Sequence, residues 1–536
     1  MSIGTERSAA VAPADPAIDA PVSPCDDQAC GASGASAQSH AAAEIQTDTA
    51  EAMKGLFGRD SLYMLLWGIQ LVIVALSTPI ITRVLGVSQF GLVAATLAVV
   101  QVVVALASFS LQSAVQRVFT NGDGDRDARR VVTMAVILAL VVCGLISATG
   151  PFWSRALGLG GYGPTLEFGV AWAGLWAITN SALGLIRSQD RLLAFGIVTL
   201  LQSVVAEVLS VAMVILVHGT ASEYVLGHLI AQAAAAAVAL VVARPMLFRR
   251  RDLPVLGGAL AFSIGLVPAA LASFVLDTSD RLIVRADLGP AAVARYAVAY
   301  NVANLTMVLL YVLNTTWMPR VFALGEARIR ASVLAESRDF LYALLIPIVV
   351  GLCAASPIIL SIWVPAGYQP SGLLWIVAIV AVTAFPFAGM MAAMRVLLFS
   401  GKTFAVGVST VIAAMANIGL NVYLVPRLGI AGASLATMCS YGLLFGLLAF
   451  RAGLVFRLPR PRIALIGRIL VATAISLAST QLPTSPATVA VRVLVALACV
   501  IAFVAMLTNV LAPKRRPLAD RIAALFHSPN LGMATE

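Results

Sequence analysis

The chain contains about fourteen stretches of roughly 20 mostly apolar residues, each long enough to cross a bilayer as one α-helix. Such stretches leave few folds open, because a chain in lipid must satisfy its backbone hydrogen bonds within helices or closed barrels. The composition agrees, since 11% of the residues are charged, against about 25% in soluble domains. We therefore predict an all-α polytopic membrane protein. Its predicted spans are 62–82, 90–114, 131–152, 166–186, 193–217, 223–243, 256–277, 292–314, 338–355, 371–394, 404–424, 430–450, 464–482 and 488–511.

Basic residues between the spans predict the orientation of the chain. Alternate gaps hold about 26 Lys and Arg residues, and the remaining gaps hold only 5. Because short cytoplasmic loops carry the excess of Lys and Arg, both termini are predicted to be cytoplasmic. The net charge of +10 therefore indicates topology rather than a nucleic-acid partner. The five residues on the predicted outer side are Arg83, Arg155, Arg281, Arg285 and Arg427.

The two ends of the chain differ from the rest. Residues 1–55 are rich in Ala, Ser, Pro and Gly, so they cannot bury enough surface to order, and they lack the apolar core of a signal peptide. We predict a disordered cytoplasmic tail there and a second cytoplasmic tail over 513–536. Cys25 and Cys30 alone have a ligand-like spacing, so neither a metal site nor a structural disulfide is expected.

A weak internal repeat divides the spans. "TRVLGVSQFGLVAA" (82–95) matches "VRADLGPAAVARYAVA" (284–299), and "EVLSVAMVILVHG" (207–219) matches "NIGLNVYLVPRLG" (417–429). The two offsets are similar, at about 203 and 210 residues. We predict two six-helix bundles, 56–247 and 248–455, related by a pseudo-twofold axis along the membrane normal, with two further helices in 456–512. Transporters built this way bind substrate between the halves and rock one half against the other.

Three segments carry a resemblance to a known family. They are "RVLGVSQFG" (83–91), "SDRLIVRADLGPAAVARYAVA" (279–299) and "NIGLNVYLVPRLGIAGASLAT" (417–437). Over about residues 60–510 the chain resembles the polysaccharide-transporter, or Wzx-like oligosaccharide flippase, branch of the multidrug/oligosaccharidyl-lipid/polysaccharide exporter superfamily.

The resemblance implies twelve core helices, often with two more, around a central cavity. It implies movement of polyprenyl-diphosphate-linked oligosaccharide across the bacterial inner membrane, for cell-surface polysaccharides such as exopolysaccharide or lipopolysaccharide. A polysaccharide polymerase and a chain-length regulator are the protein partners expected of such a pathway.

Polar residues inside the spans are candidates for the cavity. Glu207 lies near the middle of 193–217, where a charge costs about 2.5–3.5 kcal/mol and faces protein or water. It would bind a proton, a cation or a sugar, or else pair with a neighbouring helix for structural reasons. Amides that would face sugar hydroxyls, or hydrogen-bond between helices instead, complete the predicted cavity. They are Asn180, Gln202, Asn301, Asn304, Asn417 and Asn421.

Charged residues near span ends are predicted to form a gate or to contact phosphate. Asp277, Asp280 and Arg281 would form an ion-pair cluster at the outer gate, and the alternative is a solvated helix end. Arg83 occupies the comparable place in the first half. Arg117 and Arg395 would meet a diphosphate at the cytoplasmic side, or snorkel to the interface as topology charges.

Catalytic signatures are missing from the sequence. It has no P-loop, zinc-ligand pattern or nucleophile elbow, which favours a non-enzymatic transporter without a cofactor, coupled to H⁺ or Na⁺. One rival is a multidrug/cation antiporter of the same superfamily. Another is a membrane polysaccharide polymerase or ligase, which would need a long outer loop, whereas the longest outer gaps have about 15 residues. His218 and His228 are interpreted as structural.

Overall fold

The computed structural model describes residues 61–120, 124–323, 327–456, 459, 461–483 and 485–511, all within one compact unit. Both predicted tails lie outside the described residues. Every element within the described ranges is helical, which confirms the predicted all-α class. Twelve of these helices are long and apolar enough to cross a membrane. One of the twelve, Leu76–Phe119, covers the second predicted span and part of the first, and Ile463–Ser479 is a shorter apolar helix, so fourteen is an approximate count.

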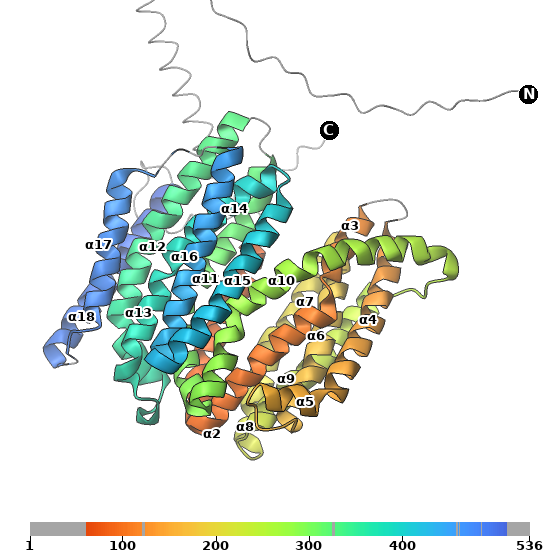
Figure 1. Cartoon of the computed structure of the whole chain (residues 1–536), viewed down its shortest axis with the longest axis horizontal. Coiled ribbons are helices and arrows are strands. Elements are labelled where there is room, and N and C mark those ends of the chain that lie inside the picture. Colours follow the sequence, from red (N-terminus) through yellow and green to blue (C-terminus); the bar gives the residue numbers. More distant parts are fainter. Residues whose placement is uncertain are drawn as a thin grey trace, which may run out of the picture. The chain divides into compact units, whose positions relative to one another are not determined.

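The first half of the chain forms one group of helices and the second half forms another (Figure 1). The first group is α2 (Ser61–Ser108), α3 (Leu111–Phe119), α4 (Asp125–Ala148), α5 (Gly150–Ala156), α6 (Pro164–Ser188), α7 (Leu192–Leu200), the π-helix η1 (Leu201–Val205), α8 (Ala206–Leu216) and α9 (Ala221–Ala243). The second is η2 (Arg250–Asp252), α10 (Leu253–Leu288), α11 (Pro290–Ala323), α12 (Ala327–Trp363), η3 (Ala366–Tyr368), η4 (Pro370–Leu373), α13 (Leu374–Val382), α14 (Ala384–Phe399), α15 (Thr403–Leu428) and α16 (Ile430–Val455). The last two helices, α17 (Ile463–Ser479) and α18 (Pro486–Leu511), pack against α12.

Two helices are longer than the sequence predicts. The span predicted over 256–277 belongs to α10, which continues to Leu288, and the span predicted over 338–355 belongs to α12, with Pro347 and Pro357 inside it. The prediction ended the first of these at Asp277 because a charge there suggested the membrane surface. In the structure Tyr441 and Tyr296 donate hydrogen bonds to Asp277 and Asp280, and the helix continues past them.

The internal repeat appears in the backbone at the two matched glycines. Gly86, the kink inside α2, has φ 67° and ψ 175°, and Gly289, between α10 and α11, has φ 81° and ψ 179°. This region is almost closed to residues with a Cβ atom. The second matched pair agrees, since Gly219 and Gly429 have φ of 70° and 62°. These conformations support the pseudo-twofold relation between the two bundles.

Substitution of Gly86 by Ala is expected to lower the free energy of unfolding by about 1–3 kcal/mol, the usual strain of such a backbone conformation. A Cβ atom at Gly86 meets nothing within 4 Å, so the effect isolates the backbone. Gly258→Ala, in α10 with equal free space and ordinary helical φ, is the matched control and should stabilise the helix. Thermal melting of the purified variants in detergent measures both, and equal melting temperatures would refute the argument.

The two halves contact each other at the end of the bundles that contains Gly86, which we name the Gly86 end and which the sequence predicts to be outer. Thr82 Oγ1 donates to the carbonyl of Trp363 over 2.7 Å, and Arg83 Nη2 donates to that of Ile362 over 2.8 Å. The Tyr368 hydroxyl donates to the carbonyl of Gly86 over 3.3 Å. Residues from α2 and α12 therefore join the two bundles at this end.

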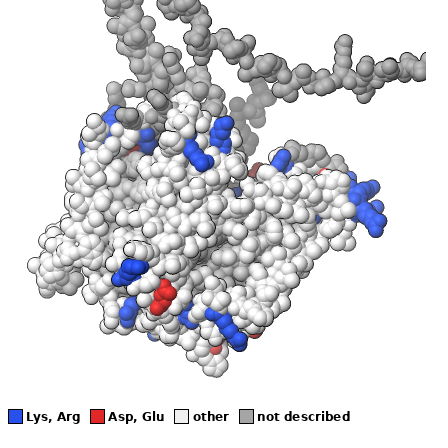
Figure 2. Space-filling view, in the orientation of Figure 1, with Lys and Arg blue, Asp and Glu red and all other residues white. Residues whose placement is uncertain are grey.

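The surface fits a bilayer. Large apolar side chains of α4 are exposed, with Leu140 and Leu145 each 62% accessible. Figure 2 shows one face of the molecule as mostly uncharged, with Lys and Arg gathered toward its upper and right margins and in its lower part. An apolar band between charged margins is the arrangement that a multi-pass membrane protein requires.

Candidate functional site

Two cavities that share lining residues lie where the two halves meet, and we call them the two lobes of the central cavity. The first lobe, of about 360 Å³, is lined by α2, α6, η1, α8 and α9 together with Arg281 of α10 and Asn301 of α11. The second lobe, of about 240 Å³, is lined mainly by α10 and α11, with Gln101 of α2, Phe387 of α14 and Tyr441 of α16. Gln101 and Arg281 line both lobes, so each half contributes one polar side chain to the boundary that the two lobes share.

Glu207 is the acidic centre of the first lobe. Its side chain is 6% exposed and accepts hydrogen bonds from Ser77 Oγ over 2.5 Å and from the Tyr224 hydroxyl over 3.0 Å. His228 Nε2 lies 3.5 Å from Glu207 Oε2, an ion pair whenever the imidazole is protonated. The other ring nitrogen of His228 faces Ser210 Oγ. A buried carboxylate beside an imidazole is an arrangement that can hold or release a proton.

Helix geometry brings these residues together. Tyr224, His228 and Gln232 follow one another at four-residue spacing, so they lie on one face of α9. The π-helix η1 precedes α8, and Gln202 within it lines the same lobe as Glu207. π-Helical turns of this kind are frequent at functional sites. Trp172 also lines this lobe, and its ring centroid lies 4.5 Å from that of His228.

One carboxylate, that of Asp277, lines the second lobe, and a second one, that of Asp280, lies one turn further along α10; a tyrosine binds each of them. The Tyr441 hydroxyl donates to Asp277 Oδ1, and the Tyr296 hydroxyl donates to Asp280 Oδ2. Arg281 lies with its guanidinium carbon 5.5 Å from the centre of the Tyr300 ring. A cation and hydroxyl groups thus face the same space, alongside Asn304.

Two members of the charged cluster after residue 276, Asp280 and Arg281, are buried, whereas Asp277 is exposed and lines the second lobe. Asp280 is 1% exposed and Arg281 is 9% exposed, so the alternative of a solvated helix end is wrong. Leu288 is the eleventh residue after Asp277 in α10, which places Asp277 about 16 Å along the helix from that terminus. These side chains line or border the central cavity; their predicted role at a gate stays a prediction.

The other predicted gate residues lie apart from the cavity. Arg83 joins the halves at the Gly86 end and is exposed. Arg117 is exposed at the opposite end, with its guanidinium 4.5 Å from the centre of the Phe262 ring. Arg395 is fully buried, and its Nη1 lies 3.5 Å from Ser337 Oγ of α12. The snorkelling alternative is therefore wrong for Arg395, because its side chain packs inside the second bundle.

The predicted amides divide into two groups. Gln202, Asn301 and Asn304 line the cavity. Asn417 and Asn421 are fully buried, where Asn417 Oδ1 accepts from Ser279 Oγ over 3.1 Å and from Asn421 Nδ2 over 3.0 Å.

For Asn417 and Asn421 these contacts fit the alternative of hydrogen bonds within the helix bundle rather than the prediction that they face sugar, since Asn417 binds α10 and the two amides bind each other. Asn180, half-buried on α6, is not among the described residues that line either lobe.

Several cavity residues were not predicted. His228 was interpreted as a lone structural histidine, and Tyr224, Tyr300, Tyr441 and Gln101 were not considered. A usable signal was present, because Tyr296, Tyr300 and Asn304 repeat every four residues along α11, as Tyr224, His228 and Gln232 do along α9. Among the described residues, no three His, Cys, Asp or Glu side chains gather to hold a metal ion.

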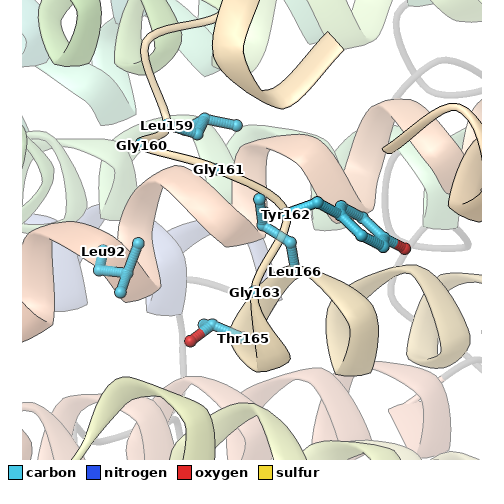
Figure 3. Close-up of a pocket in the computed structure, with 8 residues that line it drawn as sticks. All are labelled: Leu92, Leu159, Gly160, Gly161, Tyr162, Gly163, Thr165 and Leu166. Atoms are coloured by element: carbon cyan, nitrogen blue, oxygen red, sulfur yellow. The ribbon is translucent and has the colours of Figure 1, made fainter. Parts of the chain in front are cut away.

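A separate pocket of about 310 Å³ lies at the Gly86 end (Figure 3). It is lined by the glycine-rich loop after α5, where the Tyr162 hydroxyl donates to Ser147 Oγ over 2.9 Å. Burial raises the pKa of Tyr162, so the phenol stays neutral. Gly158 approaches Ala286 of α10 closely, and this loop therefore belongs to the contact between the halves rather than to the central cavity.

Known structures share this architecture. The chain is similar to the lipid II flippase MurJ in an inward closed conformation, with a TM-score of 0.64 and 15% identity over 84% of this chain and 99% of that one. It is also similar to an inward-facing multidrug resistance MATE family transporter of the MOP superfamily, with a TM-score of 0.52 and 12% identity over 80% of this chain and 98% of that one. No match to a curated protein was found.

The fold and its central cavity define a multi-pass membrane protein with the fold of MOP-superfamily transporters. A family model described as polysaccharide biosynthesis protein matches residues 80–371. That match covers more than half of the chain, and the protein belongs to this family.

Proposed function

We propose that the protein is a flippase that moves polyprenyl-diphosphate-linked oligosaccharide across the bacterial inner membrane by alternating access. The observation that carries the proposal is the position of Arg281, a cation from the second half that lines both lobes of a cavity shared with the first. A guanidinium binds phosphate oxygens in a bidentate manner. The amides of Gln101, Gln202 and Asn301 would hydrogen-bond sugar hydroxyls.

Transport would be coupled to the binding of a cation, because the cavity also contains carboxylates. A diphosphate entering beside Glu207 and Asp277 is repelled unless their charge is neutralised. Proton binding by the Glu207–His228 pair would remove the part of this repulsion that Glu207 causes, and Na⁺ is the other candidate ion. Binding of the cation then raises the affinity for the anionic headgroup, and binding of the headgroup raises the affinity for the cation by the same factor.

The predicted topology completes the proposal. Both termini would be cytoplasmic, and the Gly86 end would face outward, so the contacts of Thr82 and Arg83 with α12 would close the cavity toward the outer side. A polymerase and a chain-length regulator would use the exported sugar to build exopolysaccharide or lipopolysaccharide. The protein itself would act without catalysis.

One observation favours a second candidate, a multidrug/cation antiporter. Glu207 and Asp277 place two carboxylates around one Arg281, which suits a cationic substrate if both are ionised. The nearby aromatic rings, including Trp172 and Tyr300, would also suit a flat organic cation. The two candidates differ in the charge of the molecule that is carried, so transport itself distinguishes them.

Reconstitution of the full chain into liposomes tests both candidates. The probe is a fluorescent polyprenyl-diphosphate-linked sugar, and a membrane-impermeant reductant quenches the molecules in the outer leaflet. Flippase activity predicts that vesicles with protein lose nearly all fluorescence, whereas protein-free vesicles lose about half. Quenching at the protein-free level, with proton-driven uptake of an organic cation dye, would contradict the proposal and favour the antiporter.

A further inference from the structure

We propose that an apolar groove beside the cavity holds the isoprenoid chain of the lipid-linked sugar while its headgroup occupies the cavity; this inference rests on the proposed function. The groove has a volume of about 220 Å³ and lies between the halves. Val102 and Leu106 of α2, Ile146 of α4, Trp153 of α5 and Leu282 of α10 are among the residues that line it.

The groove and the cavity share two walls. On α2, Gln101 lines both lobes of the cavity and the next residue, Val102, lines the groove. On α10, Arg281 lines both lobes and the next residue, Leu282, lines the groove. Successive side chains on a helix point about 100° apart. The helices α2 and α10 therefore present polar side chains to the cavity and apolar side chains to the groove. The groove and the cavity therefore lie on neighbouring faces of the same two helices, beside Arg281.

The chemistry of the groove selects a hydrocarbon. Every lining side chain is apolar, and the indole N–H of Trp153 already donates to the carbonyl of Ile146 over 2.9 Å. A peptide placed there would leave its backbone polar groups unsatisfied, whereas an isoprenoid chain has none. Ordinary phospholipid acyl chains share this chemistry. The shared walls favour the chain of the substrate, because a tethered chain binds at a high effective concentration once its headgroup is in place.

Photolabelling of the full chain in nanodiscs tests the inference. The probe is a polyprenyl diphosphate with a diazirine on the isoprene units nearest the diphosphate, and the labelled residues are mapped by mass spectrometry. We expect labels on residues 102–106 and on Leu282. Ile146→Trp should lower labelling by about fivefold or more, because added volume fills the groove. Leu145→Trp is the matched control, since the neighbouring side chain is 62% exposed and should leave labelling unchanged.

A second variant, Val102→Phe, provides the same test from α2 if Ile146→Trp does not yield folded protein. A phospholipid with a diazirine in its acyl chain is the control for the source of the chain. Equal labelling of the groove by both probes, or isoprenoid labels elsewhere, would overturn the inference. Flipping of the sugar lipid with labels outside the groove would refute the inference and leave the proposed function standing. Groove labelling without flipping would support the inference and count against transport.

Discussion

Replacement of Arg281 by Gln is expected to lower the flipping rate of a lipid-linked sugar by roughly 10- to 100-fold, because hydrogen bonds to charged groups contribute about 1.5–3 kcal/mol. Arg281 is the cation that lines both lobes of the cavity, and its guanidinium faces the space where a diphosphate would sit. The rate is measured by fluorescence quenching in liposomes that contain the purified variant.

Two further variants interpret the result for Arg281. Arg281→Lys keeps the charge but loses the planar fork, so its rate should fall between those of the wild type and Arg281→Gln. Arg427→Gln is the matched control, because this exposed arginine contacts only Tyr423 on its own helix in the described contacts. Wild-type flipping by correctly inserted Arg281→Gln would remove the main support for the flippase proposal.

Replacement of Glu207 by Gln is expected to abolish coupling to a proton gradient while leaving the protein folded. Ser77 donates to Oε1 and Tyr224 to Oε2 of Glu207, so the single amide oxygen of glutamine keeps one of these acceptors, but the side chain no longer binds a proton. A potential of about 100 mV supplies about 2.3 kcal/mol per charge, enough for roughly 50-fold accumulation by the wild type. The variant should show no accumulation when the probe distribution is measured across energised vesicles.

Glu223→Gln is the control for this experiment. Glu223 accepts a hydrogen bond from the backbone of Thr220 over 2.8 Å at the start of α9 and does not line either described lobe. Its replacement should weaken a helix cap and leave proton coupling intact. His228→Gln should resemble Glu207→Gln, because the imidazole lies 3.5 Å from the carboxylate. If probe accumulation by Glu207→Gln depended on the proton gradient as it does in the wild type, the Glu207–His228 pair would be ruled out as the proton-binding site, and Na⁺ would be tested as the coupling ion.

The class of fold was predictable because lipid imposes a simple rule on sequence. Apolar runs of about 20 residues must be helices, and matched glycines marked the repeat before their shared backbone conformation was known. The end of α10 was not predictable from the same rule. Asp277 and Asp280 remain in the membrane region because Tyr441 and Tyr296 bind them, and those tyrosines belong to other helices.

The candidate site was predictable only in part, because a sequence does not show how each helix is rotated. Glu207 and Asn301 were selected as polar residues in apolar runs, and both line the cavity. Asn417 and Asn421 satisfied the same criterion, yet their helix turns them toward α10. His228 was missed because a single histidine near a span end is usually structural, and its contact with Glu207 joins two helices.

The π-helix η1 determines the direction in which the Glu207 side chain points. Its five residues, Leu201–Val205, insert one wider turn between α7 and α8. In a regular α-helix each residue adds a rotation of about 100° around the axis. One residue more or fewer in the turn therefore rotates the side chains of α8 by about 100° relative to α7. The widened turn therefore determines which face of α8 points toward the first lobe, and the direction of the Glu207 side chain depends on the one extra residue in that turn. Loss of a single amino acid from this turn would direct the carboxylate away from its partners without altering any side chain that contacts it.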